Sequence, residues 1–383
     1  MHVTTAARTT AVVAAGALAA SVAPTVPAHA AAPAWRVVRT YDNGKYDSLD
    51  GVVALSRKDA WAFGGGDRKK GDFNRPLAYR WNGKTWNGSP LPAGLTGQLH
   101  GGSASSPSNV WAYGSRSEAG GTGGPYVLRW NGRKWAVAKR FKDGYITGVT
   151  ALGPSNVWVF GAPGADKGVG TWHFNGRTWT ALKNPPALIA RATYSSPSNV
   201  WANARGLNGD SRTIVRFDGK RWKVVPTGRL LPPDVHSPSG PTQHVYVGTP
   251  LVRSAKEVWV SATVDRYGPA PKYTRTTTPL LLRWNGKAWQ KFAAPAGRSI
   301  AQVVPDGRGG LWASQWTGGD RMALRHRSAA GKWTTAAITG TGGRVPQVYG
   351  MALFPGTRSV LGAGQLSVPG GHTSDGALFY FKG

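Results

Sequence analysis

One short segment recurs along the chain with almost the same spelling. It reads SSPSNVWAYG from Ser105, GPSNVWVFG from Gly153 and SSPSNVWANA from Ser195. A segment repeated at such intervals marks a structural unit that buries its apolar face only by stacking on further copies of itself. The number of copies and their arrangement therefore constrain the fold more than any other feature of the sequence.

Aligning the chain on the tryptophan of this segment identifies seven units. The aligned positions are 43 to 58 residues apart, and they are Trp61, Trp111, Trp158, Trp201, Trp259, Trp312 and, in the seventh unit, Val360. A four-stranded blade of a β-propeller takes about 40 to 50 residues. Each unit begins with a short apolar segment, such as LDGVVALS, and then passes through a turn, typically Ser/Pro/Asn, into a run that is apolar at successive positions. These features predict a first strand and a second strand that is buried on both faces.

The third and fourth strands of each unit are predicted from a hairpin signal. Asn-Gly or Asp-Gly stands between β-type residues in YRWNGKTW, LRWNGRKW, HFNGRTW, RFDGKRW and LRWNGKAW. Two-residue loops of this composition favour a type I′ turn. The sixth unit has the longer turn HRSAAGKW, and the seventh unit stops after its third strand, ALFYFKG.

The strand missing from the seventh unit is found at the other end of the chain, where AWRVVRT precedes the first unit without a third strand of its own. We expect residues 35–40 to pair with residues 377–381, because an open series of sheets would leave both of its edges unpaired. The predicted fold is all-β, a single seven-bladed propeller over residues 31–383. Its blades are expected at about 49–92, 99–140, 146–185, 189–226, 245–294, 300–338, and 348–383 plus 33–40.

The repeats resemble those of a known class of propeller. Gly64 and Gly65 after WAF, followed by Tyr79 and Trp86, are similar to a kelch repeat, and the SNVW…RWNGxxW pattern resembles repeats of secreted bacterial propellers. The resemblance covers essentially the whole predicted mature chain and implies the propeller architecture, but no particular activity, because propellers carry many unrelated functions. It implies no cofactor either: galactose oxidase, a kelch-like enzyme, needs a cysteine-tyrosine cofactor, and this chain has no cysteine.

The first 30 residues have the composition of a secretory signal peptide. Arg8 precedes an apolar run over residues 11–23, and the Ala-His-Ala triplet at 28–30 fits a small-x-small cleavage site. The run is too short to span a bilayer. We therefore expect a monomeric protein that begins near Ala31, has no transmembrane segment and is secreted or associated with the cell wall.

Basic residues dominate the charge of the chain and recur at one position of the repeat. Lys and Arg number 47 against 17 Asp and Glu, a formal net charge of +30, which favours polyanions or anionic surfaces as partners. The residue after the hairpin glycine is basic in all six continuous units: Lys84, Arg133, Arg177, Lys220, Lys287 and Lys332. The third strands add Arg80, Arg129, Arg216, Arg283 and Arg325, with His173 in the third unit. Two interpretations stay open, a polyanion-binding ring or charge that prevents edge pairing between molecules.

Strand alternation places the turns between strands one and two, and between strands three and four, on one face of the disc, the hairpin face. The opposite face, the variable face, carries the longer loops, including residues 227–244 and 262–279 beside the fifth unit. Binding residues are commonly carried on such loops. The predicted ligand surface is Tyr267, Tyr273, Arg275 and Trp316, with packing and spacer roles as the alternative.

Motifs for catalysis and metal binding are absent from the sequence. There is no HExxH and no GxSxG, and the histidines have no metal-ligand spacing. Paired-carboxylate chemistry stays open, because four aspartates fall on variable-face loops: Asp210, Asp234, Asp265 and Asp320.

The sequence favours a secreted, non-enzymatic propeller that binds an anionic polymer or a glycan at or near the cell envelope. The alternative is a carbohydrate-active enzyme, a glycosidase or lyase, with its site on the variable face. Extracellular nucleic acid is a third class of partner, which shares the charge argument but has no recognised reading motif in this chain.

Overall fold

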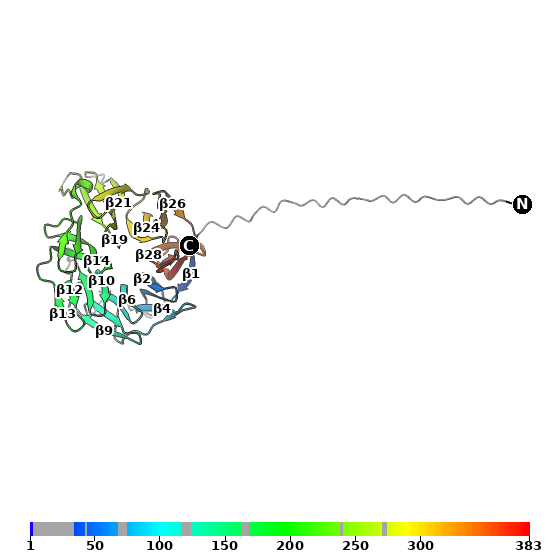
Figure 1. Ribbon diagram of the computed structural model, residues 1–383, viewed down its shortest axis with the longest axis horizontal. Coiled ribbons are helices and arrows are strands. Elements are labelled where there is room, and N and C mark those ends of the chain that lie inside the picture. The colour runs from blue at the N-terminus through cyan, green and yellow to red at the C-terminus, as the bar shows by residue number, and fades with distance from the viewer. Residues whose placement is uncertain are drawn as a thin grey trace. The chain divides into compact units, whose positions relative to one another are not determined.

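Seven antiparallel sheets follow one another in chain order around a ring, as the colours in Figure 1 show. The structure is a computed structural model that describes residues 1–2, 34–42, 44–67, 75–115, 124–161, 168–237, 240–269 and 274–383. All of the sheets lie in the unit Pro33–Gly383. The expected all-β, seven-bladed propeller is confirmed.

The first three blades each have four strands in simple sequence order. Blade 1 contains β2 (Ser48–Ser56), β3 (Asp59–Gly66), β4 (Arg75–Trp81) and β5 (Trp86–Gly88). Blade 2 contains β6 (Gln98–Ser106), β7 (Asn109–Ser115), β8 (Tyr126–Trp130) and β9 (Trp135–Arg140). Blade 3 contains β10 (Gly148–Gly153), β11 (Asn156–Gly161), β12 (Gly170–Phe174) and β13 (Trp179–Ala181).

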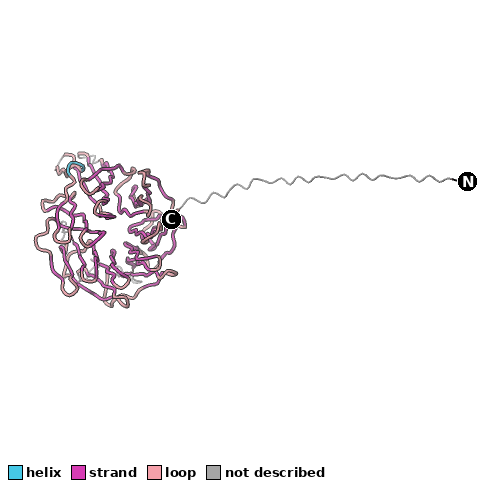
Figure 2. The backbone as a smooth tube through the Cα atoms, viewed as in Figure 1, coloured by secondary structure: helices cyan, strands magenta, loops and turns pink. Residues whose placement is uncertain are grey.

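Blades 4 to 6 repeat this order, with one split strand. Blade 4 contains β14 (Ala187–Ser196), β15 (Asn199–Gly206), β16 (Thr213–Phe217) and β17 (Trp222–Val224). Blade 5 contains β18 (Thr242–Val247), β19 (Leu251–Ser254), β20 (Glu257–Tyr267), β21 (Arg275–Trp284) and β22 (Trp289–Ala293), where β18 and β19 both pair with β20. Blade 6 contains β23 (Ile300–Pro305), β24 (Leu311–Gly318), β25 (Arg321–Arg327) and β26 (Trp333–Ala336). Among the described residues the one helical segment is the three-residue 3-10 turn η1 (Gly228–Leu230), cyan in Figure 2.

The seventh blade confirms that the two ends of the propeller pair with each other. It contains β28 (Val345–Leu353), β29 (Val360–Ser367), β30 (Ser374–Phe381) and β1 (Trp35–Tyr41). Strand β1 lies antiparallel to β30, with Trp35 opposite Phe381 and Thr40 opposite Ala377. A further strand that the sequence did not predict, β27 (Ile338–Thr339), pairs in parallel with the outer edge of β1. The end of blade 6 is thereby joined to the closing blade.

The hydrophobic core lies between neighbouring blades, in seven clusters that each combine residues of two adjacent blades. In five of these interfaces the second-strand tryptophan meets the fourth-strand tryptophan of the next blade edge to face, with ring centroids 5.1 to 5.9 Å apart and planes at 81° to 89°. The pairs are Trp61–Trp135, Trp111–Trp179, Trp158–Trp222, Trp201–Trp289 and Trp312–Trp35. Edge-to-face contact is a favoured geometry for aromatic rings, so the repeated tryptophan is the residue that joins one blade to the next.

The strand pairing corrects the alignment of the seventh unit by one residue. In blade 1 the fourth-strand tryptophan, Trp86, pairs with Trp81, the residue after Arg80. In blade 7 the fourth-strand tryptophan, Trp35, pairs with Phe381, the residue after Tyr380. Tyr380 therefore aligns with Arg80. Arg80 lies opposite Trp61, whereas Tyr380 lies opposite Leu361. The tryptophan position of blade 7 is therefore occupied by Leu361, and its assignment to Val360 was wrong.

The hairpins between third and fourth strands form as predicted, but the turn type differs. Gly83 has a positive φ of +94°, but the next residue, Lys84, does not have a positive φ. Among the described non-glycine residues, a positive φ occurs at Asn184. A type I′ turn needs positive φ at both central residues, whereas glycine at the first central position is the requirement of type II′. The central residues are Gly83 and Lys84, and Asn82 Oδ1 accepts hydrogen bonds from the N–H groups of Lys84 and Thr85, both at 2.9 Å. The basic residue thus occupies the exposed second position of the turn.

Candidate functional site

The arginines of the third strands are held inside the blade interfaces. The guanidinium carbon of Arg80 lies 5.3 Å from the ring centroid of Trp61, and its Nε and Nη2 atoms donate to the carboxylate of Asp59, both at 3.0 Å. The same stacking on the second-strand tryptophan, at 5.4 to 5.5 Å, is made by Arg129, Arg216 and Arg283. These cations act as packing groups and are not free members of a charged ring.

In the sixth blade this position belongs to His326, not to Arg325. His326 lies opposite Trp312, with ring centroids 4.7 Å apart, and its Nε2 atom is 2.9 Å from Asp306 Oδ2. Burial acts to raise the pKa of Asp306, but hydrogen bonds from His326 and from two backbone N–H groups outweigh it and hold the pKa below its ordinary value. Arg325 is displaced by one residue and donates to Gln315 Oε1 at 3.3 Å.

The six cations of the hairpin turns have different surroundings. Every one of their side chains is exposed, and none forms an ion pair or a side-chain hydrogen bond with a described residue. They occupy equivalent turns on the hairpin face of blades 1 to 6: Lys84, Arg133, Arg177, Lys220, Lys287 and Lys332. We call this set the hairpin ring.

The structure brings together two of the four residues of the predicted ligand surface. Tyr267 and Arg275 lie opposite each other in β20 and β21, with the guanidinium carbon 5.6 Å from the tyrosine ring. The Nη2 atom of Arg275 pairs with buried Asp265 at 2.7 Å. Trp316 lies instead beside Tyr349, with ring centroids 6.3 Å apart. Tyr273 lies outside the described residues.

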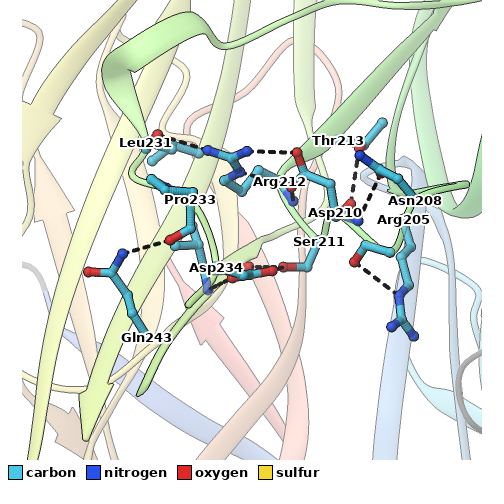
Figure 3. A network of polar contacts seen from close by, with 12 residues as sticks. Arg205, Asn208, Asp210, Ser211, Arg212, Thr213, Leu231, Pro233, Asp234 and Gln243 are labelled. Carbon is cyan, nitrogen blue, oxygen red and sulfur yellow. Dashed lines mark hydrogen bonds and ion pairs between the residues drawn. The ribbon is translucent and has the colours of Figure 1, made fainter. Parts of the chain in front are cut away.

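Three of the four variable-face aspartates hold loops in place. Asp265 is engaged by Arg275, and Arg212 donates from Nε and Nη2 to the two carboxylate oxygens of Asp210, both at 2.9 Å. The pKa of Asp210 is lowered, chiefly by the hydrogen bonds from Arg212. Asp234 accepts hydrogen bonds from Ser211 Oγ at 2.8 Å and from the Val245 N–H at 2.7 Å, and Figure 3 shows how Asp210 and Asp234 tie neighbouring loops together. Asp320 is exposed.

The centre of the ring forms a second candidate site, built by the first strands of all seven blades. A channel of about 270 Å³ opens into a wider mouth of about 640 Å³, and the two share Asp50, His100, Arg191, Ala301 and Tyr349. The wider mouth is also lined by Ser48 and Ala301, at the starts of β2 and β23, and by Thr147 directly before β10, so it opens on the variable face. We call it the central funnel.

Glycines let the first strands converge below this mouth. A Cβ atom on Gly51 would lie 2.7 Å from the Cα atom of Gly101, and a Cβ atom on Gly350 would lie 2.9 Å from the Cα atom of Gly51. A side chain at either position would therefore force neighbouring blades apart. Polar groups gather directly above this narrow part.

One side of the central funnel is a hydrogen-bonded row that starts at Asp50. Ser48 Oγ donates to Asp50 Oδ1 at 2.7 Å, and Gln98 Nε2 donates to Asp50 Oδ2 at 3.0 Å. The same Gln98 nitrogen lies 3.1 Å from His100 Nδ1, and His100 Nε2 lies 2.6 Å from Ser115 Oγ. The row has the composition of a Ser-His-Asp triad, which makes the direction of its hydrogen bonds decisive.

The tautomer of His100 sets the direction of those bonds. His100 Nδ1 lies 3.1 Å from Gln98 Nε2 and 3.5 Å from Asp50 Oδ2, and the tautomer in which it accepts from Gln98 carries its proton on Nε2. His100 Nε2 then donates to Ser115, whereas a general base would accept the serine proton at this atom. In this tautomer the row offers hydroxyl, imidazole and carboxylate groups for binding and no activated serine.

Blade 7, which neighbours blade 1 around the ring, forms the adjoining side of the central funnel. Tyr349 Oη donates to Gln347 Oε1 at 2.6 Å, and Gln365 Nε2 donates to the same oxygen. Burial, assisted by the charges of Asp50 and Asp320, raises the pKa of Tyr349, so its hydroxyl stays protonated at neutral pH. No cluster of three potential metal ligands occurs in the described parts of the chain.

The central funnel was not predicted from the sequence. The segments whose sequence predicts first strands contain Asp50, His100, Arg191 and Tyr349. The signal in the sequence is a charged residue within a predicted first strand. Such a strand lines the axis of the ring, and a charged side chain there avoids burial by facing the channel. Sequence periodicity does not show which of these side chains meet.

Comparisons with protein-family models and with curated proteins find no match for this chain. Solved structures do match, at low sequence identity. One is YCF48 bound to D1 peptide, 11% identical, with 91% of this chain and 96% of that chain covered and a TM-score of 0.53. Another is a polysaccharide lyase, a PL25 ulvan lyase bound to -[GlcA(1-4)Rha3S]-, 12% identical, with 90% and 96% covered and a TM-score of 0.52. A third is the β-propeller domain of the trilobed protease from Pyrococcus furiosus, 11% identical, with 88% and 94% covered and a TM-score of 0.52.

These three likenesses establish the β-propeller fold. They do not select a ligand, because one of the proteins is bound to D1 peptide and another to -[GlcA(1-4)Rha3S]-. In the described part of the chain no helix is long and apolar enough to cross a membrane.

Proposed function

We propose that this protein is a binding protein for anionic polymers or anionic glycans, and that the hairpin ring makes the contact. The observation that carries the proposal is one exposed cation without an acidic partner at the same turn of six blades. A regular spacing of like charges on a rigid ring matches the repeated charge of a polymer, and each contact releases a counterion.

The position of these cations supports binding over protection of sheet edges. Charges that protect an edge lie on the edge strand itself. Lys84 belongs to the turn before β5, whose exposed residues Asn87 and Gly88 are uncharged. The outer strands of blades 2, 4 and 5 carry exposed cations of their own, Arg140, Lys223 and Lys291, apart from the hairpin ring. The hairpin ring therefore faces solvent beyond the end of the edge strand.

The test replaces the six residues of the hairpin ring by Gln in one variant. We expect it to elute from a heparin or polyphosphate matrix at clearly lower salt than the unmodified protein, because fewer counterions are released on binding. Each lost contact lowers the slope of log affinity against log salt by about 0.7 to 0.9 if the polymer behaves as nucleic acids do. Retention between low salt and about 0.5 M salt is the measurement.

A matched control removes the same charge from the variable face. Six exposed cations there are suitable for replacement by Gln: Lys142, Lys183, Arg205, Arg266, Arg298 and Arg321. This control should elute close to the unmodified protein. Equal elution of the two six-site variants would show that net charge alone governs retention and would remove the hairpin ring from the proposal.

The central funnel favours a second function, the binding of a small polar ligand such as a sugar unit. Its mouth combines the Asp50 carboxylate and the His100 imidazole with the hydroxyl of Tyr349, and a protonated tyrosine both donates and accepts. Trp316 adds an aromatic face beside Tyr349. A small number of precisely placed polar groups beside an aromatic surface is typical of sites that bind small ligands.

Asp50→Asn tests this second function against a panel of saccharides. The substitution keeps the shape of the side chain but removes its charge, and we expect at least about a tenfold loss of affinity for any bound sugar. Tyr246→Phe, at an exposed tyrosine outside the central funnel, is the control and should bind like the unmodified protein. Unchanged affinity of Asp50→Asn would contradict sugar binding at this mouth. Cleavage of a panel member would support the alternative, a glycosidase or lyase.

The place of action is part of the same proposal. Its support is the signal-peptide character of residues 1–30, which argues for a secreted or cell-wall-associated protein at the cell envelope. The assignment of the repeats to the kelch-like, secreted bacterial type is also part of the proposal. Its support is the SNVW…RWNGxxW pattern of the sequence.

A further inference from the structure

The interface between blade 7 and blade 1 lacks the second-strand tryptophan that the other six interfaces contain. In blades 1 to 6 the second strand places a tryptophan against the next blade, whereas blade 7 places Leu361 there. Leu361 packs on Trp81 and Trp86, which correspond to the rings that meet Trp61 at the next interface, Trp130 and Trp135. A leucine is much smaller than the indole for which the rest of this interface is shaped.

A cavity of about 540 Å³ occupies this place. Its walls include Leu361, Trp81, Trp86, Tyr380 and Phe354, which form an aromatic and aliphatic side of the cavity. The two tryptophan rings lie 5.7 Å apart with their planes at 40°, and Tyr380 lies 6.2 Å from Phe354. Pockets that bind small molecules have volumes of about 300 to 1,000 Å³. We call this cavity the seventh-interface pocket.

The rim of the seventh-interface pocket is positively charged. Four cations line it, Arg36, Arg57, Lys84 and Lys382, together with the last residue, Gly383, and no acidic side chain does. None of the four pairs with an acidic group of the described residues. Arg36 lies over Tyr380 with its guanidinium carbon 5.8 Å from the ring centroid, which orients it along the aromatic wall.

We propose that the seventh-interface pocket binds a small organic anion that carries a flat aromatic or apolar ring. The ring takes the place that a tryptophan side chain fills in the other interfaces, and the carboxylate or other anionic group meets the cations at the rim. Burial of the ring supplies affinity, and the charge selects anions over neutral molecules of the same shape. This site is separate from the central funnel and needs only Lys84 from the hairpin ring.

The test uses 2-naphthoate as the probe and its neutral analogue 2-naphthamide as the comparison, both titrated by calorimetry. We expect the unmodified protein to bind the naphthoate at least about tenfold more tightly than the amide. Leu361→Trp, which restores the residue of the other six blades, should weaken naphthoate binding by at least about tenfold, because the indole fills the pocket. Leu361→Met leaves the volume nearly unchanged and should bind within about threefold of the unmodified protein.

A second variant keeps the proposal testable if Leu361→Trp fails to fold. Arg57→Gln combined with Lys84→Gln should reduce naphthoate binding to the level of the amide, while Lys183→Gln combined with Lys256→Gln removes the same charge elsewhere and should have no effect. The proposal is wrong if the unmodified protein does not bind naphthoate, if it binds the amide equally well, or if a folded Leu361→Trp variant binds as before. Because the probe is a small molecule, these outcomes do not depend on whether the hairpin ring binds polymers.

Discussion

Removal of residues 34–41 is expected to lower the melting temperature by at least about 10 °C. The deletion takes away β1, and with it fully buried Trp35, the antiparallel pairing with β30 and the parallel pairing with β27. Loss of a buried tryptophan alone costs about 3–5 kcal/mol, and the total stability of a domain is only about 5–15 kcal/mol. Thermal unfolding followed by circular dichroism is the measurement.

Two controls connect this result with ring closure. Val38→Ala changes a half-exposed residue of the same strand and should shift the melting temperature very little. A synthetic peptide of residues 34–42, added to the deletion variant, should restore part of the lost stability, because it offers the missing strand to the edge of β30. An unchanged melting curve for the deletion would contradict closure by β1.

Trp111→Ala is expected to reduce the free energy of unfolding by about 3–5 kcal/mol. Trp111 is fully buried, and its ring centroid lies 5.6 Å from that of Phe174 and 5.9 Å from that of Trp179 in the next blade. Its Nε1 atom donates to Asn109 Oδ1 at 3.0 Å. The alanine variant loses the ring contacts and leaves Asn109 with an unused acceptor. Denaturant unfolding gives the measurement.

The matched variants separate the ring from its hydrogen bond. Trp111→Phe keeps an aromatic ring and should lose less free energy of unfolding than Trp111→Ala, since part of the interface remains filled. Tyr246→Ala, at a half-exposed tyrosine, should change it by less than about 0.5 kcal/mol. A loss below about 1 kcal/mol for Trp111→Ala would contradict the view that the tryptophan joins the blades.

The architecture could be predicted because its signals are local and repeated. The Asn-Gly hairpins and the buried second strands each lie within a few residues, and the unmatched strands at the two ends indicated closure. The errors arose where a unit departs from the repeat. Without a tryptophan the seventh unit gave no anchor, so Val360 was aligned in place of Leu361, and the longer turn of the sixth unit moved His326 into the position expected for Arg325.

The candidate sites could be predicted only in part, because some of their residues lie far apart along the chain. The hairpin ring follows directly from the repeat, because each of its members has the same place in its own unit. Asp50 and Tyr349 belong to opposite ends of the sequence and meet only because the ring closes between blades 7 and 1. Similarly, Leu361 becomes notable only when it is set against Trp81 and Trp86 of the first blade.

The pairing of β1 with β30 also sets the order in which the protein can fold during synthesis. Six blades are built from contiguous stretches of chain, so each can form as soon as its own residues have been made. Trp35 is among the first residues of the propeller to be produced, yet its partner Phe381 is among the last. Until then both β1 and the open side of blade 1 expose apolar surface and unpaired backbone groups, which are prone to association with other chains. We therefore expect a chain halted before residue 374 to aggregate, and ring closure to be the final, chain-length-dependent step of folding.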